Sequence, residues 1–262
     1  MALPNKAPWS EWSFQLRVGA NRVNGIYSEN KYAFNPLIVG TTEDVWNEGG
    51  VLSFLSAAET MSLVSSDGAD DGDPQGNGAW QVEVFGVGND YQPVSEIVTL
   101  NGTMPVVTTA SFLRINRMRI IGAGSNGTNV GTITATASTA ATVQASIGAG
   151  LGSTTKSQYT VPAGFFAFVL DWKVSTLNND QVEADFQTRV EDGAWILRNR
   201  LTFVESAVEQ NFLSPLVIAP KSDIRVQAVR ISGSGNVRVS SNYDFYLVKE
   251  SLVGENNVLR GG

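Results

Sequence analysis

The sequence contains no cysteine and no histidine, and only 16% of its 262 residues are charged. Without cysteine the chain has no disulfide framework and no thiolate to bind a metal or act as a nucleophile. Without histidine it has no Ser-His or Cys-His catalytic pair, no histidine general base and no histidine-containing zinc site. Paired carboxylates, which carry out glycoside hydrolysis, remain as catalytic groups.

Basic residues are also scarce, because 18 Lys and Arg stand against 25 Asp and Glu and give a formal net charge of −7. Binding to a nucleic-acid backbone requires clustered Lys and Arg, so we expect no nucleic-acid partner. Residues 1–10 lack the apolar segment of a signal peptide. No apolar run in the sequence is long enough to span a bilayer, so we expect no membrane partner.

What the sequence does contain is a series of short strand patterns separated by Gly, Asn and Pro. Gln81–Phe85 alternates polar and apolar residues, and Glu96–Leu100 leads into Asn101-Gly102, a strong two-residue hairpin signal. Glu191–Gly193 indicates another hairpin turn. Short strands at this spacing predict an all-β protein built of two β-sandwich, jelly-roll-like domains.

Two blocks of the chain resemble each other. Leu113–Ile120 aligns with Ile224–Ile231, and each block runs into a Gly-x-Gly turn and follows a Gly-Ala-Trp tripeptide. The shared order indicates two domains of similar topology. Chance similarity remains the alternative, because alternating Ile, Val and Arg is common in amphipathic strands.

These patterns predict the domain boundaries. Aromatic residues without a clear period mark the first segment, which packs on its own chain or reaches a neighbouring subunit. Residues 137–155 carry no charge and little large apolar surface, which is typical of a crossing between domains. We therefore expect an N-terminal arm (1–40), a first β-sandwich (41–140), a Gly/Ser/Thr-rich linker (141–155), a second β-sandwich (156–250) and a C-terminal tail (251–262).

Four aspartates, Asp67, Asp70, Asp71 and Asp73, lie in one Gly-rich segment. Such segments are mostly solvated loop tips, and a catalytic acid needs a more enclosed environment to raise its pKa. A calcium ion suits several oxygen ligands on a flexible loop, but Ala69 stands where the EF-hand spacing needs a ligand. We expect no cofactor, with calcium at the Asp67–Asp73 loop as the alternative.

Interface residues are predicted in two places. The aromatic side chains of Trp9, Trp12 and Phe14 lie in the N-terminal arm. Arg117 and Arg119 share one face of a predicted strand and Arg114 lies on the other face. Interleaved with apolar residues, these arginines are typical of a packed boundary or of inter-subunit partners for carboxylates.

A family resemblance rests on a series of segments in fixed order. These segments are Glu43–Gly50, Ala58–Ser66, Val82–Val84, Val94–Gly102, Ser111–Arg117 and Tyr159–Phe165. Through them the chain resembles, over about residues 43–165, a set of little-characterised structural proteins of marine tailed bacteriophages. The resemblance implies a virion component rather than an enzyme.

From the resemblance and the composition we expect a non-catalytic bacteriophage virion protein, assembled in the host cytoplasm. Its expected role is that of a capsid decoration or cement protein, a homotrimer bound to the major capsid protein. Sandwich domains leave strand edges that symmetric assemblies can pair or cover.

Three alternatives stay open. The first is a neck, tail or head-fibre protein that binds a host glycan, with Trp80, Trp172, Trp195 or Tyr91 as the stacking platform. The second is a jelly-roll major capsid protein. The third is a glycan depolymerase, which would need two carboxylates converging in a groove.

Overall fold

The computed structural model describes residues 13–176, 179–204 and 206–254. Over these residues the chain is almost entirely β-strand, so the predicted all-β class is confirmed. The helical elements described are one short helix, α1 (Phe14–Gly19), and a single 3-10 turn, η2 (Glu250–Leu252). Within the described ranges, no helix is long and apolar enough to cross a membrane.

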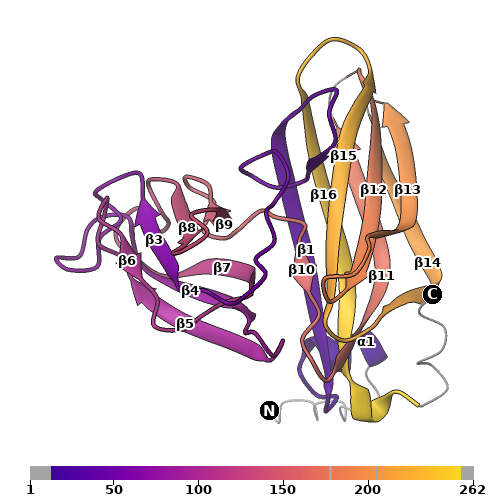
Figure 1. Cartoon of the computed structure of the whole chain (residues 1–262), viewed down its shortest axis with the longest axis horizontal. Coiled ribbons are helices and arrows are strands. Elements are labelled where there is room, and N and C mark those ends of the chain that lie inside the picture. The colour runs from indigo at the N-terminus through magenta and orange to yellow at the C-terminus, as the bar shows by residue number, and fades with distance from the viewer. Residues whose placement is uncertain (1–12, 177–178, 205, 255–262) are drawn as a thin grey trace, which may run out of the picture.

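The strands form two lobes that lie side by side (Figure 1). The large lobe contains one sheet in the order β1-β16-β11-β14 and a second in the order β10-β15-β12-β13, with β2 paired to β15. Its strands are β1 (Ile26–Ile38), β2 (Glu43–Asp44), β10 (Tyr159–Thr160), β11 (Phe165–Thr176), β12 (Gln181–Val190), β13 (Ile196–Val204), β14 (Ala207–Ile218), β15 (Ser222–Ser232) and β16 (Val237–Lys249). Both sheets contribute to one core, in which the rings of Trp172 and Tyr243 pack edge-on against Phe186.

The small lobe contains a sheet in the order β6-β3-β8-β9 and another in the order β5-β4-β7. Its strands are β3 (Met61–Ser65), β4 (Ala79–Val87), β5 (Pro93–Thr99), β6 (Val106–Val107), β7 (Arg114–Ala123), β8 (Ile133–Ala137) and β9 (Val143–Ile147). A second core lies between these sheets, with Met61, Phe112 and Met118 fully buried. The small lobe is therefore an insertion between β2 and β10 of the large lobe.

The predicted N-terminal arm needs correction, because residues 26–38 form β1 of the large lobe. β1 pairs antiparallel with β16 along most of its length. Its buried positions include Lys31, Ala33 and Asn35, whereas Tyr32 on its other face is exposed. The sequence of β1 therefore lacks a polar and apolar alternation, although its side chains point in turn to a buried and an exposed face.

The predicted linker also needs correction, because residues 143–147 form β9, which pairs with β8. Ala145 and Ile147 of this strand are fully buried in the small-lobe core. The small side chains that indicated a weakly structured crossing are the ones that fit against the neighbouring sheet.

Two predicted turns have different outcomes. Glu191–Gly193 lies between the antiparallel partners β12 and β13, so this hairpin is confirmed. Asn101-Gly102 is a turn with a positive φ at Gly102, but it connects β5 to β6, which belong to different sheets. The two similar blocks contribute β7 and β15, and the sheets of the two lobes differ in strand order.

Candidate functional site: the junction and groove between the lobes

Arg114, the first residue of β7, reaches from the small lobe into the large lobe. Its Nε lies 3.2 Å from Oδ1 of Asp223 on β15, and the two side chains are 4% and 0% exposed. Thr160 Oγ1 donates to the same Asp223 oxygen at 2.6 Å. Arg114 Nη1 donates to the backbone carbonyl of Leu55 at 2.6 Å. The buried charges thus have hydrogen-bond partners, which is the condition under which burial of an ion pair is tolerated.

A second arginine and two aromatic rings extend this contact. Arg189 Nε donates to Oδ2 of Asp223 at 2.9 Å, so one carboxylate serves both guanidinium groups. The Arg189 guanidinium lies 4.5 Å from the ring centre of Phe54 and 4.7 Å from that of Trp195. These cation–π contacts cover the ion pairs with apolar rings and reduce their exposure to water.

Two lysines are buried at the same junction. Lys31 Nζ on β1 donates to the backbone carbonyl of Asn116 on β7 at 2.6 Å. Lys156 Nζ donates to the carbonyls of Ile115 and Gln144 at 3.0 and 2.8 Å. Burial lowers the pKa of Lys31 well below its ordinary value, and it lowers the pKa of Lys156 to about 7.

The segment 154–160, which enters the large lobe from the small one, is buried throughout. Ser157 Oγ donates to the carbonyl of Val226 at 3.1 Å, and Tyr243 OH donates to the carbonyl of Ser157 at 2.6 Å. Asn116 and Thr160 exchange two hydrogen bonds, from Nδ2 to the carbonyl at 2.9 Å and from the amide to Oδ1 at 2.7 Å. Side chains of both lobes therefore hold this connection in one conformation.

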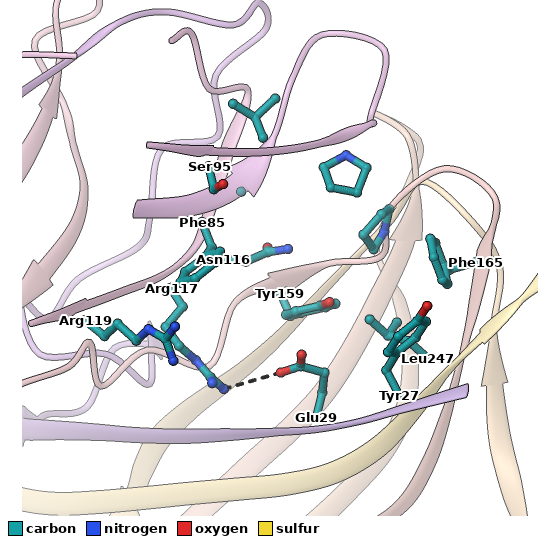
Figure 2. A pocket seen from close by; sticks show the side chains of 14 residues that line it. Tyr27, Glu29, Phe85, Ser95, Asn116, Arg117, Arg119, Tyr159, Phe165 and Leu247 are labelled. Atoms are coloured by element: carbon teal, nitrogen blue, oxygen red, sulfur yellow. Dashed lines mark ion pairs between the residues drawn. The ribbon is translucent and has the colours of Figure 1, made fainter. Parts of the chain in front are cut away.

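A groove of about 500 Å³ opens beside the junction (Figure 2). Tyr27 and Phe165 of the large lobe line one end, where their ring centres are 6.0 Å apart with the edge of one toward the face of the other. Phe85 and Arg119 of the small lobe line the other end. Pockets of this size at domain boundaries, mostly apolar with a few convergent polar groups, are where ligands commonly bind.

Arg117 and Glu29 face each other in this groove. Arg117 Nη2 lies 3.7 Å from Glu29 Oε2, and each side chain is about one third exposed, at 34% and 35%. Nη2 also donates to the carbonyl of Asn30. Within the described ranges, the other nitrogens of this guanidinium donate to no protein atom. The pair is therefore loose, and both of its side chains line the groove.

Arg119 is held more tightly. Its Nε and Nη2 donate to Oε2 of Glu83 at 2.9 and 2.8 Å, and its guanidinium lies 5.1 Å from the ring centre of Phe85. Arg119 is thus a fixed part of the groove wall.

The structure describes four of the predicted interface residues, Phe14, Arg114, Arg117 and Arg119, and places them in different surroundings. Phe14 is exposed on α1 and packs edge-on against Tyr246, with ring centres 5.8 Å apart. Trp9 and Trp12 lie outside the described residues. Arg117 and Arg119 line the groove, but Arg114 is buried and bonded within its own chain, so its assignment to a contact with another subunit is corrected. The packed boundary that the arginine pattern indicated lies between two lobes of one chain.

The aromatic residues considered as a glycan-stacking platform do not line the groove. Trp172 is fully buried and Tyr91 is 7% exposed. Arg225 covers the Trp195 ring at 3.9 Å, and Trp80 Nε1 donates to the carbonyl of Gly76 at 2.7 Å. The aromatic rings that do line the groove come from segments far apart in sequence, so no local pattern indicated them.

The aspartate segment has a structural role at Asp70, which is fully buried. Its Oδ1 accepts from the amides of Ala79 and Val130, both at 2.8 Å. Its Oδ2 accepts from Ser65 Oγ at 2.6 Å and from the Gly131 amide at 2.9 Å. Within the part of the chain that the structure describes, no group of three acidic side chains is placed to hold a metal ion. The expectation of no cofactor, with calcium at the Asp67–Asp73 loop as the alternative, stays a prediction.

The edge strands β13 and β14 of the two large-lobe sheets lie on the side of that lobe that faces away from the small lobe (Figure 1). We call this side the β13–β14 edge and define it by the exposed apolar side chains of Ile196, Leu197, Val204 and Leu213. Leu213 is 104% exposed, because residues 212–215 bulge out opposite Leu170 of β11. The sequence does not indicate this edge, because polar and apolar alternation does not show which face of a strand lacks a covering sheet.

Comparisons with known proteins give little further information. No family model and no curated protein matches the chain. A structure of infectious bursal disease virus, Gx strain, is 9% identical, with a TM-score of 0.25 over 87% of this chain and 73% of the other. The VP2 subviral particle of the same virus is 10% identical, with a TM-score of 0.14 over 89% and 83%. TM-scores this low support no conclusion about fold or function.

Proposed function

We propose that the chain is a non-catalytic structural subunit of a virion, and that it assembles through the β13–β14 edge. The observation that carries the proposal is the fully exposed Leu213 on the bulged edge strand β14, together with the exposed Ile196 and Leu197 on the other edge strand, β13. Soluble proteins usually protect edge strands with charge or cover them, and an exposed apolar edge indicates a partner.

The junction supports a structural role in a second way. Arg114, Asp223 and Arg189 bind the two lobes through buried, charge-assisted contacts, and Lys31 and Lys156 add bonds to backbone carbonyls. Such a junction keeps the orientation of the lobes constant, which a subunit that bridges neighbours in a shell requires.

The arrangement of carboxylates favours this role over that of a glycan depolymerase. Hydrolysis of a glycosidic bond requires two carboxyl groups on either side of the bond. Among the described residues that line the groove, Glu29 is the one carboxylate, and it faces Arg117.

At a finer level we propose a capsid decoration or cement protein, present as a homotrimer on the major capsid protein. The resemblance to structural proteins of tailed bacteriophages supports this assignment. Two facing sheets around one core in each lobe support the further assignment of both lobes as jelly-roll-like sandwiches.

Light scattering on the purified chain tests the assembly surface. We expect the wild-type protein to have the mass of an oligomer and the Leu213→Asp variant to have the mass of a monomer at the same concentration. Ile97→Asp is the matched control, because Ile97 is an exposed apolar residue on β5 of the small lobe. A monomeric wild type, or equal masses for wild type and Leu213→Asp, would contradict the proposal.

A second candidate function, a neck, tail or head-fibre protein that binds a host glycan, is favoured by one observation, the aromatic groove beside the junction. Its binding site would differ from the one expected from the tryptophans of the sequence.

A further inference from the structure

We propose that the groove between the lobes binds an uncharged pyranose sugar, with two neighbouring hydroxyl groups held between Arg117 and Glu29. This inference goes beyond the assembly role, because the groove and the β13–β14 edge have no residue in common.

The apolar part of the groove fits one face of a sugar ring. Tyr27 and Phe165 form an edge-to-face pair at one end, and Leu247 lies beside them (Figure 2). The axial C–H groups of a pyranose form an apolar patch that packs against the negative face of an aromatic ring. A volume of about 500 Å³ is sufficient for one or two sugar units.

The polar part of the groove selects hydroxyl groups. Arg117 can only donate hydrogen bonds, and the Glu29 carboxylate can only accept them. Their atoms are 3.7 Å apart, which is too long for a good hydrogen bond. A hydroxyl group donates and accepts at once, so two neighbouring hydroxyls can accept from Arg117, donate to Glu29 and replace the loose contact between them.

The charges indicate an uncharged ligand. Arg117 and Glu29 cancel each other, and Arg119 is neutralised by its bonds to Glu83. A purely apolar ligand would bury Arg117 and Glu29 without adding partners, which is unfavourable. An acidic sugar would gain Arg117 but would place its carboxylate against Glu29.

The neighbouring polar residue Asn116 has a different role. Both ends of its side-chain amide are bonded to the backbone of Thr160. Asn116 is therefore a positioning residue, which fixes β10 and with it Tyr159 in the groove wall.

The proposal is tested by saturation-transfer NMR and calorimetry on the full chain, with maltotriose, mannotriose, galactotriose and chitotriose as probes. We expect at least one of the four to bind. We expect Tyr27→Ala and Glu29→Gln each to weaken that binding by about tenfold or more. Tyr32→Ala is the matched control, because Tyr32 is an exposed tyrosine on the same strand that does not line the groove. It should bind as the wild type does.

Unchanged melting temperatures will show that each variant is folded, and binding by Leu213→Asp at wild-type affinity will separate this site from the assembly surface. The proposal is overturned if none of the four sugars binds, or if Tyr27→Ala and Tyr32→Ala bind equally well. It is also overturned if a peptide with the sequence of residues 1–13 binds in the groove and the sugars do not, because the groove would then be a peptide site.

Discussion

Arg114 and Asp223, separated by 109 positions in the chain, form a buried ion pair between the two lobes with Nε and Oδ1 3.2 Å apart. Asp223 also binds Arg189 and Thr160, so its carboxylate is the centre of the junction. Removal of one partner from such a pair leaves an uncompensated charge in a dry environment. The pair therefore requires that both lobes remain docked.

Arg114→Leu should lower the free energy of unfolding by about 3–5 kcal/mol, because it leaves the buried Asp223 with one guanidinium fewer. Denaturant unfolding measures this change. Arg200→Leu is the control, because Arg200 forms a more exposed contact with Asp185 on the surface. Its loss should be clearly smaller, because water screens an exposed ion pair. Equal losses for the two variants would show that the junction does not stabilise the fold.

The buried Lys156 predicts a pH dependence with a defined sign. Above about pH 7 Lys156 is neutral in the fold, whereas an unfolded lysine keeps its proton up to about 10.4. Unfolding then takes up a proton, so stability should rise between pH 7 and about 10, at up to about 1.4 kcal/mol per pH unit for this group. Below pH 7 this lysine should add no slope.

Lys31 has the same sign, because burial lowers its pKa as well. Buried Tyr243, whose pKa is raised well above its ordinary value, should reverse the trend at higher pH. Urea unfolding across pH 7 to about 10 measures the slope. The slope should be smaller in Lys156→Met, and a slope that this substitution leaves unchanged would contradict the account of the junction.

Whether a strand could be predicted from the sequence depended on which of its side chains face inward. β12 alternates with Val182, Ala184 and Phe186 buried, so the pattern predicted it directly. β1 buries the polar residues Lys31 and Asn35, whose hydrogen-bond partners lie elsewhere in the chain. Its sequence therefore lacks the polar and apolar alternation that would have predicted a strand. The sequence indicated that Arg114 lies at a packed boundary, but not that Asp223 faces it.

The groove was not predictable for a related reason. Tyr27, Phe85 and Phe165 line it from three strands that are distant in sequence. Packing of the folded chain brings these strands together. No local sequence motif therefore indicates that their side chains meet.

Gly86 on β4 gives a prediction about the register of the small lobe. A Cβ atom at this position would lie 2.0 Å from the backbone carbonyl oxygen of Arg114. Gly86→Ala should therefore force β4 away from β7 and lower the melting temperature. Gly127→Ala gives a comparison, because Gly127 has open space around it and only its positive φ opposes the substitution. A smaller loss for Gly86→Ala than for Gly127→Ala would contradict the packing described for β4 and β7.

A substitution at Asp70 distinguishes a structural role of this residue from a role in binding a metal ion. Asp70→Asn keeps the shape but replaces one acceptor oxygen with a donor, opposite amides and a hydroxyl that donate to it. We expect a loss of about 1–3 kcal/mol or more, because a buried group is left without its partner. Millimolar calcium should not change the melting temperature of the wild type. A calcium-dependent increase that Asp70→Asn abolishes would instead establish the loop as a calcium site.

The most direct test of the central claim is the copy number of this chain in purified virus particles, measured by quantitative mass spectrometry against the major capsid protein and the portal protein. A decoration subunit should be present in numbers of the same order as the major capsid protein. A number close to that of the portal would place the chain at the neck, tail or a fibre and contradict the decoration role. Absence from the particles would contradict the structural function itself.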